Sequence, residues 1–324
     1  MNTAAAQLGA VLAAGGPELT RQLERTETRL AEVAGRHGPE LARYAGATLA
    51  AGGKRLRPML VFLCANGDGD DRLVAGAAAV ELLHMATLVH DDVLDRAPLR
   101  RGRPTVFAEG GRLAATATGD LLFSRAFAEL ASTGSADAVD ALSKASSALA
   151  RGELMQRADA WSADVRPERY LERCRLKTAS LFAASCRLGA LFGGRPELAG
   201  ELGAFGDDVG LAFQMLDDVL DVAGPAERTG KPRGTDLLDG TVTLPLILAR
   251  ERDPSLAEPS PDRTPEQAEE IGDRIAATGA LDAARDQALT HVAEAKRSLA
   301  RLDLPAQRRE ALALVADGVV ERYA

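Results

Sequence analysis

Two copies of the pentapeptide Asp-Asp-Val-Leu-Asp stand out in this sequence, at residues 91–95 and 217–221. On a helix, positions i, i+1 and i+4 lie on one side, so each copy is expected to project three carboxylates onto one face. Three negative charges this close need solvent or bound cations, and oxygen ligands suit Mg²⁺, which usually bridges carboxylates to substrate phosphates. We therefore interpret the copies as opposite sides of a divalent-metal site rather than two solvated acidic faces. The predicted ligands are Asp91, Asp92, Asp95, Asp217, Asp218 and Asp221.

Three cationic, glycine-containing segments lie outside the pentapeptides, at residues 52–58, 96–104 and 230–236. The first combines a glycine turn with three cations, which suits either an anion site or a basic surface turn, and it lacks the spacing of a P-loop. The second places four arginines directly after the first pentapeptide, where they either neutralise the aspartates or hold metal-bound phosphates. The third belongs to a glycine- and proline-containing loop over residues 224–240, which we interpret as a lid.

Isolated polar residues interrupt the apolar segments near the pentapeptides. His84 lies two helical turns before the first copy, on its aspartate face, although a single histidine in such a helix is usually a satisfied core residue. Lys177 and Thr178 lie in an apolar run, where a lysine must either reach water or meet an anion. Gln214 lies three residues before the second copy, on the same face.

These residues together favour a substrate that joins a diphosphate to a hydrocarbon. The carboxylates and cations match the phosphate, and the apolar helices behind them match the hydrocarbon. The sequence contains no obvious nucleophile. The expected chemistry is therefore ionisation, in which Mg²⁺ and cations stabilise departing pyrophosphate while an apolar pocket shelters the carbocation from water.

Composition limits the class of protein. The chain has 324 residues, 46% of them hydrophobic but only 4% aromatic, which favours helix over sheet. Its net charge of −8 argues against nucleic acid as the main partner. The three cysteines lack a metal-ligand spacing and fit reduced core thiols. We find no signal peptide and no apolar run long enough to span a membrane, and we expect a cytoplasmic protein.

Helical periodicity extends over almost the whole chain, without any strand pattern, and predicts a single domain over residues 1–324. The expected helices cover residues 5–14, 17–35, from 39, from 59, 73–95, 113–131, 136–161, 170–192, 202–222, 243–250, 266–301 with a break near 279, and 305–323.

Five sequence blocks carry a family resemblance. They are GGKRLRP (52–58), HMATLVHDDVLDRAPLRRGRPTV (84–106), LKTASLF (176–182), FQMLDDVLDV (213–222) and GKPRGTDLLDGTVTLP (230–245). In this order they closely resemble the trans-isoprenyl diphosphate synthases, or polyprenyl synthetases. The resemblance implies the all-α isoprenoid synthase fold, about a dozen helices around a central active-site cavity, and a homodimer. It also implies head-to-tail (1′-4) condensation of isopentenyl diphosphate with an allylic diphosphate, assisted by two or three Mg²⁺ ions.

The resemblance also implies a role for individual residues. The allylic diphosphate would be bound by Arg100, Lys177, Gln214 and Lys231. Isopentenyl diphosphate would be bound by Lys54, Arg57, His84 and Arg101. The carbonyl of Lys177, with Thr178 and Gln214, would stabilise the allylic cation, and the released pyrophosphate would take the final proton. Thr241 departs from the family pattern, because many relatives have a lysine there, and this difference puts a second lid lysine in doubt.

Product length depends on the residues behind the first pentapeptide. Thr87 and Ala86 lie about 6–7.5 Å deeper along the helix than Asp91, where relatives often have aromatic residues that end chain growth early. Both are small, which favours an open tunnel and a product of thirty carbons or more, closed by a residue on another helix. A close helix–helix packing seam explains the small residues equally, and geranylgeranyl diphosphate is the alternative product.

Two other classes of protein share part of this pattern. A terpene cyclase would ionise an allylic diphosphate but would not need a second diphosphate site. A non-catalytic subunit of a heteromeric synthase typically lacks some of the aspartates, all of which are present here.

Overall fold

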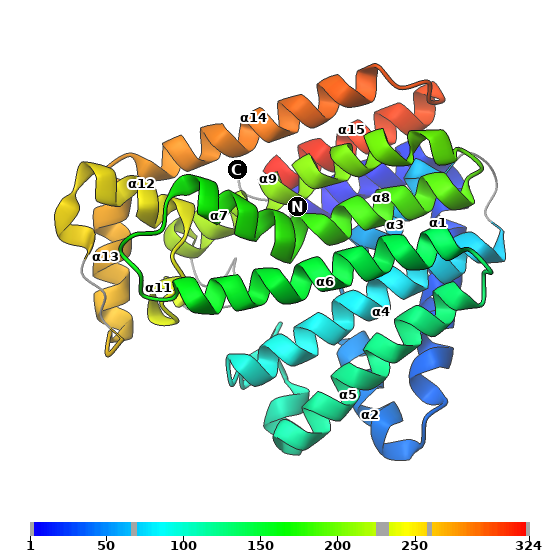
Figure 1. The fold of residues 1–324 in the computed structure, drawn as a ribbon, viewed down its shortest axis with the longest axis horizontal. Coiled ribbons are helices and arrows are strands. Elements are labelled where there is room, and N and C mark those ends of the chain that lie inside the picture. Colours follow the sequence, from blue (N-terminus) through cyan, green and yellow to red (C-terminus); the bar gives the residue numbers. More distant parts are fainter. Residues whose placement is uncertain (1–2, 66–69, 225–232, 258–260, 322–324) are drawn as a thin grey trace.

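The computed structural model describes residues 3–65, 70–224, 233–257 and 261–321, and its elements are almost all helices, which confirms the all-α prediction (Figure 1). The long helices are α1 (Thr3–Gly35), α2 (Pro39–Ala50), α3 (Leu56–Cys64), α4 (Asp71–Leu94), α5 (Val106–Ala131), α6 (Ala136–Asp159), α7 (Pro167–Cys174), α8 (Ser180–Phe192) and α9 (Ala199–Ala223). The later helices are α11 (Thr235–Leu238), α12 (Leu244–Arg252), α13 (Pro265–Ala277), α14 (Ala280–Ala300) and α15 (Ala306–Glu321). Short 3₁₀ turns cover Pro196–Leu198 and Pro254–Ala257.

Helices α4 and α9 form the centre of the bundle. Helix α4 packs against α5, α3 and α8, and α9 packs between α8 and α14 (Figure 1). Asp70 caps the start of α4 by accepting hydrogen bonds from the backbone N–H groups of Arg72 and Leu73. Every residue from 73 to 83 is buried, because α4 has neighbours on all sides.

The expectation that no segment could span a membrane needs a correction at α4. This helix is long and apolar enough to cross a bilayer by length and composition, but 78% of its apolar window is buried inside the fold. Its apolar character therefore reflects its central position in the bundle.

A short hairpin replaces the expected loop after the first pentapeptide, so the prediction of no strands was wrong there. Strands β1 (Leu99–Arg100) and β2 (Arg103–Pro104) pair antiparallel, with Leu99 opposite Pro104. The two turn residues, Arg101 and Gly102, have φ of 52° and 73°. Positive φ at both positions is typical of the tight hairpin turn whose twist matches the strands. A strand of two residues is too short to show an alternation of apolar and polar residues in the sequence.

The predicted helix over residues 170–192 is interrupted by a π-helical turn at Arg175–Ala179, between α7 and α8. Two glycines approach this turn closely. A Cβ on Gly152 of α6 would lie 2.5 Å from the backbone nitrogen of Lys177, and one on Gly210 of α9 would lie 2.5 Å from Cα of Ala179. Only glycine lets α6 and α9 hold the turn from both sides.

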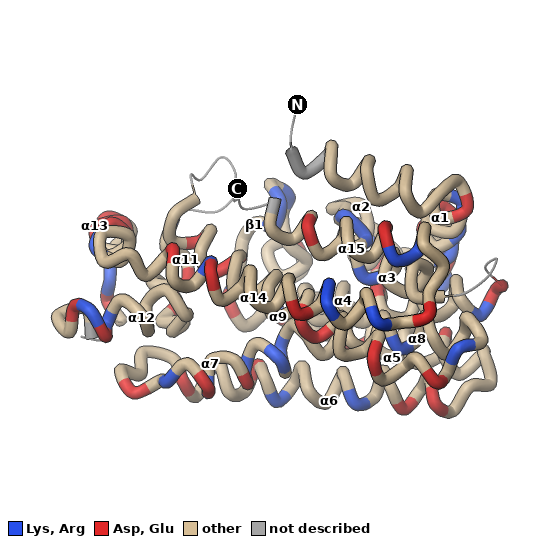
Figure 2. Tube along the Cα trace, turned by 90° about the horizontal axis from the view of Figure 1, so that it is seen from above, with Lys and Arg blue, Asp and Glu red and all other residues tan. Residues whose placement is uncertain are grey.

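Charged residues of both signs are interspersed along the bundle (Figure 2). Many form pairs between helices, such as Arg29 of α1 with the buried Glu129 of α5 at 2.8 Å.

Within the predicted lid loop, the structure describes residues 233–240, which include the single-turn helix α11. Lys231 lies outside the described residues.

Candidate active site

A cavity bounded by α4, α6, α9 and the π-helical turn holds about 1270 Å³ of space, including its open mouth. Both pentapeptides line it, with Asp91 and Asp95 from α4 and Asp217 and Asp218 from α9. Its wall also contains the apolar side chains of Leu149, Leu181 and Phe213. The fold therefore brings four of the six predicted metal ligands together beside an apolar surface.

The other two aspartates do not border the cavity in the part of the chain that the structure describes. Asp92 is buried at an adjoining pocket, where its carboxylate accepts a hydrogen bond from Nε of Arg100 at 2.8 Å. Asp221 accepts a hydrogen bond from the backbone N–H of Asp236 at 3.1 Å and so holds the start of α11. Adjacent helical residues differ by about 100° in direction, which separates Asp92 from Asp91. Asp221 points in nearly the same direction as Asp217 but lies one turn further along α9, beside α11.

Burial and crowding make two of the cavity carboxylates, Asp91 and Asp218, hard to ionise. Burial raises the pKa of Asp91 to about 6; nearby Lys177 and Arg100 lower it, and the negative charges of Glu153 and Asp95 raise it further. Burial also raises the pKa of Asp218 to about 7, against the stabilising effect of its hydrogen bonds and with a small increase from Asp217. A divalent cation would relieve this repulsion, and carboxylate oxygens are the ligands that Mg²⁺ prefers. The residues present thus fit the predicted metal.

A hydrogen-bonded chain links the π-helical turn to α9. The hydroxyl of Thr178 donates to Oε1 of Gln214 at 2.7 Å, and Nε2 of Gln214 donates to Oδ1 of Asp218 at 2.7 Å. The hydroxyl of the fully buried Tyr170 donates to Oδ2 of Asp218 at 2.7 Å. Thr178 and Gln214 therefore lie together in the cavity wall, as predicted, while Tyr170 has no sequence signal that connects it to this site.

Lys177 is held by a carboxylate that was not predicted from the sequence, Glu153. Its Nζ lies 2.5 Å from Oε2 of Glu153 on α6, and Glu153 also accepts a hydrogen bond from Arg157 at 2.9 Å. Arg157 in turn donates to Oδ1 of Asp95 at 2.6 Å. Burial opposes ionisation of Glu153, but the two cations outweigh it and its pKa is lowered. An arriving diphosphate would compete with Glu153 for Lys177.

Three of the four residues predicted to bind isopentenyl diphosphate lie near one another. His84 lines both the cavity and the adjoining pocket, which Arg101 also lines, and Arg57 lines the cavity. Burial lowers the pKa of Arg57 to about 10, and its buried Nε has no hydrogen-bond partner among the described residues. Burial and the charges of Arg57 and Arg101 lower the pKa of His84 well below its usual value. Such a cluster of cations favours an anionic ligand.

Lys54 is not among the described residues that line these two pockets. It lines a separate, mostly apolar pocket formed with residues of α1, α3, α9 and α15, including Leu8 and Leu314. The backbone of Arg55 has φ of 48°, so the chain turns sharply at this residue, between Lys54 and Arg57. Spacing along the sequence could not predict this turn.

The two residues proposed to control product length have different surroundings. Thr87 lines the cavity, whereas Ala86 is fully buried and is not among the described residues that border it. His90 lies one turn after Ala86, and its ring packs so closely on α5 that a Cβ at Gly119 would be 2.3 Å from Nε2. The face that carries Ala86 therefore packs on α5, which favours a helix packing seam at this position.

The polyprenyl synthetase family model matches residues 39–276. The chain is 48% identical over 220 residues to heptaprenyl diphosphate synthase component 2 of Geobacillus stearothermophilus, covering 67% of this chain and 68% of that protein. It is 37% identical to the short chain isoprenyl diphosphate synthase of Methanothermobacter thermautotrophicus, over 94% of this chain and 97% of that protein.

Solved structures give a consistent result. The crystal structure of a polyprenyl synthase from Caulobacter crescentus, complexed with calcium and isoprenyl diphosphate, superposes with a TM-score of 0.88. Its sequence is 35% identical, and the match covers 95% of this chain and 98% of that one. The fold is therefore that of the isoprenyl diphosphate synthases.

Proposed function

Because the chain belongs to the polyprenyl synthetase family, we propose that this transferase condenses isopentenyl diphosphate head to tail with an allylic diphosphate. One observation carries the proposal: four aspartates from two helices share a cavity with Lys177 and Arg57 and with an apolar wall. The charged part suits a diphosphate with divalent metal, and the apolar part suits a growing hydrocarbon chain.

Two diphosphates require two sets of cations. We assign the allylic diphosphate to Arg100, Lys177 and Gln214, together with Lys231, which lies outside the described residues. We assign isopentenyl diphosphate to Arg57, His84 and Arg101. The family resemblance also assigns Lys54 to isopentenyl diphosphate, and Lys54 borders a neighbouring pocket that shares Phe213 with the cavity.

The cavity carboxylates would hold two or three Mg²⁺ ions, which neutralise charge as pyrophosphate departs. The bond between C1 of the allylic substrate and oxygen breaks, and its electron pair leaves with pyrophosphate. The carbonyl of Lys177, the hydroxyl of Thr178 and the amide oxygen of Gln214 then face the allylic cation, while the apolar wall excludes water. The isopentenyl double bond attacks C1, and pyrophosphate takes the proton that the new chain loses.

We propose a long product, of thirty carbons or more. The small side chain of Thr87 on the cavity wall supports this length, because it leaves room for the chain beyond Asp91. The decisive experiment incubates the purified protein with farnesyl and isopentenyl diphosphates and Mg²⁺ and measures product length by chromatography. A product that ends at twenty carbons would instead identify a geranylgeranyl diphosphate synthase. Turnover of the allylic substrate without isopentenyl diphosphate would favour a cyclase.

The variant Thr87→Phe tests the cavity wall directly. A phenyl ring at this position would fill the cavity beside Asp91, so we expect products several isoprene units shorter with the reaction rate largely kept. Ala86→Phe is the matched comparison, because Ala86 faces α5 rather than the cavity. There we expect overpacking that costs about 1–3 kcal/mol of stability without a comparable shortening. The opposite pattern would place Ala86 in the tunnel wall.

A role as one subunit of a heteromeric synthase is the second candidate. Two relatives carry the name heptaprenyl diphosphate synthase component 2, and one of them is 48% identical to this chain. We favour a self-sufficient cytoplasmic homodimer, because all six aspartates are present. Activity of the purified chain alone decides between the two, since an obligate component would be inactive without its partner.

A further inference from the structure

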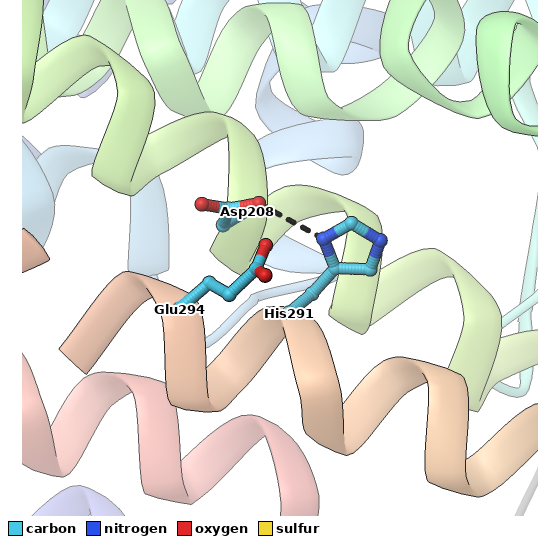
Figure 3. Close-up of side chains that lie close together, drawn as sticks. All are labelled: Asp208, His291 and Glu294. Atoms are coloured by element: carbon cyan, nitrogen blue, oxygen red, sulfur yellow. Dashed lines mark hydrogen bonds and ion pairs between the residues drawn. The ribbon is translucent and has the colours of Figure 1, made fainter. Parts of the chain in front are cut away.

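Three side chains with metal-binding chemistry meet between α9 and α14 (Figure 3). Asp208 comes from α9, and His291 and Glu294 come from α14. Nδ1 of His291 lies 2.9 Å from Oδ1 of Asp208. One ligand atom from each residue can be chosen so that all three lie within 4.8 Å of one another. The cluster has no part in the prenyl transfer proposed above.

The cluster lies apart from the cavity. Asp208 lies nine residues before Asp217 on α9. Nine residues make about two and a half helical turns, so the two side chains point to opposite sides of the helix. Asp217 lines the cavity, whereas Asp208, His291 and Glu294 are not among the described residues that do. A cation bound here would therefore be separate from the ions at the pentapeptides.

The geometry suits a small cation. His291 and Glu294 are three residues apart and share one face of α14, and both helices hold their backbones rigidly. Ligand atoms around a tetrahedral Zn²⁺ lie about 3.3 Å apart, which side-chain rotations can reach from the present spacing. The side chain of His291 is 16% exposed and that of Asp208 is 22% exposed, while that of Glu294 is 47% exposed and leaves a path for entry.

The neighbouring arginines do not prevent the cluster from binding a metal ion. Arg297 lies 3.3 Å from Glu294, but its side chain is 65% exposed, so this surface ion pair is weak and exchangeable. Arg175 lies 3.4 Å from Asp207, the neighbour of Asp208. The simpler alternative is that His291 and Asp208 form only a hydrogen bond between helices.

We propose that Asp208, His291 and Glu294 bind one transition-metal cation of the Zn²⁺ type and thereby link α14 to α9. One imidazole and two carboxylates form a mixed nitrogen and oxygen ligand set, which suits zinc, cobalt or nickel, whereas Mg²⁺ prefers oxygen alone. The ion would fasten the outer helix to the helix that carries the second pentapeptide.

The test titrates the full chain with Zn²⁺ by calorimetry and with Co²⁺ by visible absorption, both in excess Mg²⁺ to occupy the oxygen-only sites. We expect one equivalent of Zn²⁺ and a Co²⁺ spectrum with nitrogen ligation. His291→Gln and Glu294→Gln should each weaken this equivalent at least about tenfold. The control is His90→Gln, because His90 also faces an aspartate, Asp120, at 3.3 Å.

The outcomes separate clearly. Loss of the equivalent in both cluster variants, with the control unchanged, supports the site. Equal binding in all three variants, or no Zn²⁺ binding in excess Mg²⁺, overturns it. Glu294 is exposed, so its variant should fold even where His291→Gln does not, and circular dichroism checks this.

Discussion

Tyr170 shows how an aromatic residue far from either pentapeptide in the sequence contributes to the candidate site. It is fully buried, and its hydroxyl fixes one oxygen of Asp218 while Gln214 fixes the other. Hydrogen-bond partners of metal ligands usually tune affinity as strongly as geometry does. The network is therefore expected to set how well Asp218 holds a metal.

We predict that Tyr170→Phe raises the Mg²⁺ concentration for half-maximal activity by about tenfold. The ring still fills its space, so the fold should be kept, but Asp218 loses one partner. Activity measured over a Mg²⁺ series gives the answer. Tyr44→Phe on α2, a buried tyrosine that does not line the cavity, should behave as the unaltered chain does.

The buried His84 is expected to make the free energy of unfolding depend on pH. Burial, with the charges of Arg57 and Arg101, lowers its pKa well below 6.5 in the folded protein. Below pH 6.5 the unfolded chain therefore binds a proton that the folded chain does not, and the free energy of unfolding falls as pH drops. The slope from this residue approaches about 1.4 kcal/mol per pH unit.

Urea unfolding at pH 7.5 and pH 5.5 measures this contribution. His84→Gln should lose less stability on acidification than the unaltered chain, because glutamine takes up no proton. His37→Gln is the comparison, since His37 is only partly buried and lies in the bend that follows α1. Parallel pH profiles for the unaltered chain and His84→Gln would contradict the burial argument.

Among the elements, the π-helical turn most directly controls the position of Lys177 and Thr178. Gly152 and Gly210 let α6 and α9 approach its backbone from two sides. A helix that contains one extra residue in a turn changes the direction of every side chain after it. This turn therefore directs the side chain of Lys177 toward Glu153 and that of Thr178 toward Gln214.

We expect Gly152→Ala to disturb this turn, because the new methyl group would lie 2.5 Å from the backbone nitrogen of Lys177. Overpacking of this kind costs about 1–3 kcal/mol of stability and should reduce the rate constant of prenyl transfer. Gly46→Ala on α2 is the control, since a Cβ there meets nothing within 4 Å. That change should stabilise the helix by up to about 1 kcal/mol. Thermal unfolding compares the stability of the two variants, and steady-state kinetics compares their activity.

The sequence predicts the helices well and the directions of side chains less well. Apolar periodicity located α4 and α9, and the paired pentapeptides correctly placed Asp91 and Asp217 in one cavity. The π-helical turn was not predicted because the run of apolar residues continues through it without a break. The sharp turn at Arg55, next to Lys54, was not predicted because it depends on the packing around it. Contacts between distant segments, such as Tyr170 with Asp218, leave no mark on local spacing.

At the scale of the whole molecule, exposed apolar residues bear on the proposed homodimer. The side chain of Leu113 on α5 is 84% exposed and that of Leu154 on α6 is 71% exposed. Leu113 and Leu154 lie on successive helices of the chain, which are joined by the short connection between Ala131 and Ala136. Burial of these two side chains against another subunit would remove apolar surface from water, which favours association.

We predict that Leu113→Glu combined with Leu154→Glu converts the proposed homodimer to a monomer. Each carboxylate would have to be buried in an apolar contact, which disfavours association while leaving the monomer's core intact. Light scattering after size-exclusion chromatography measures the mass directly. Leu289→Glu on α14, whose native side chain is 37% exposed, should leave the mass unchanged. If the double variant keeps the dimer mass, the interface lies on another face, and if the unaltered chain is monomeric, α5 and α6 have a different partner.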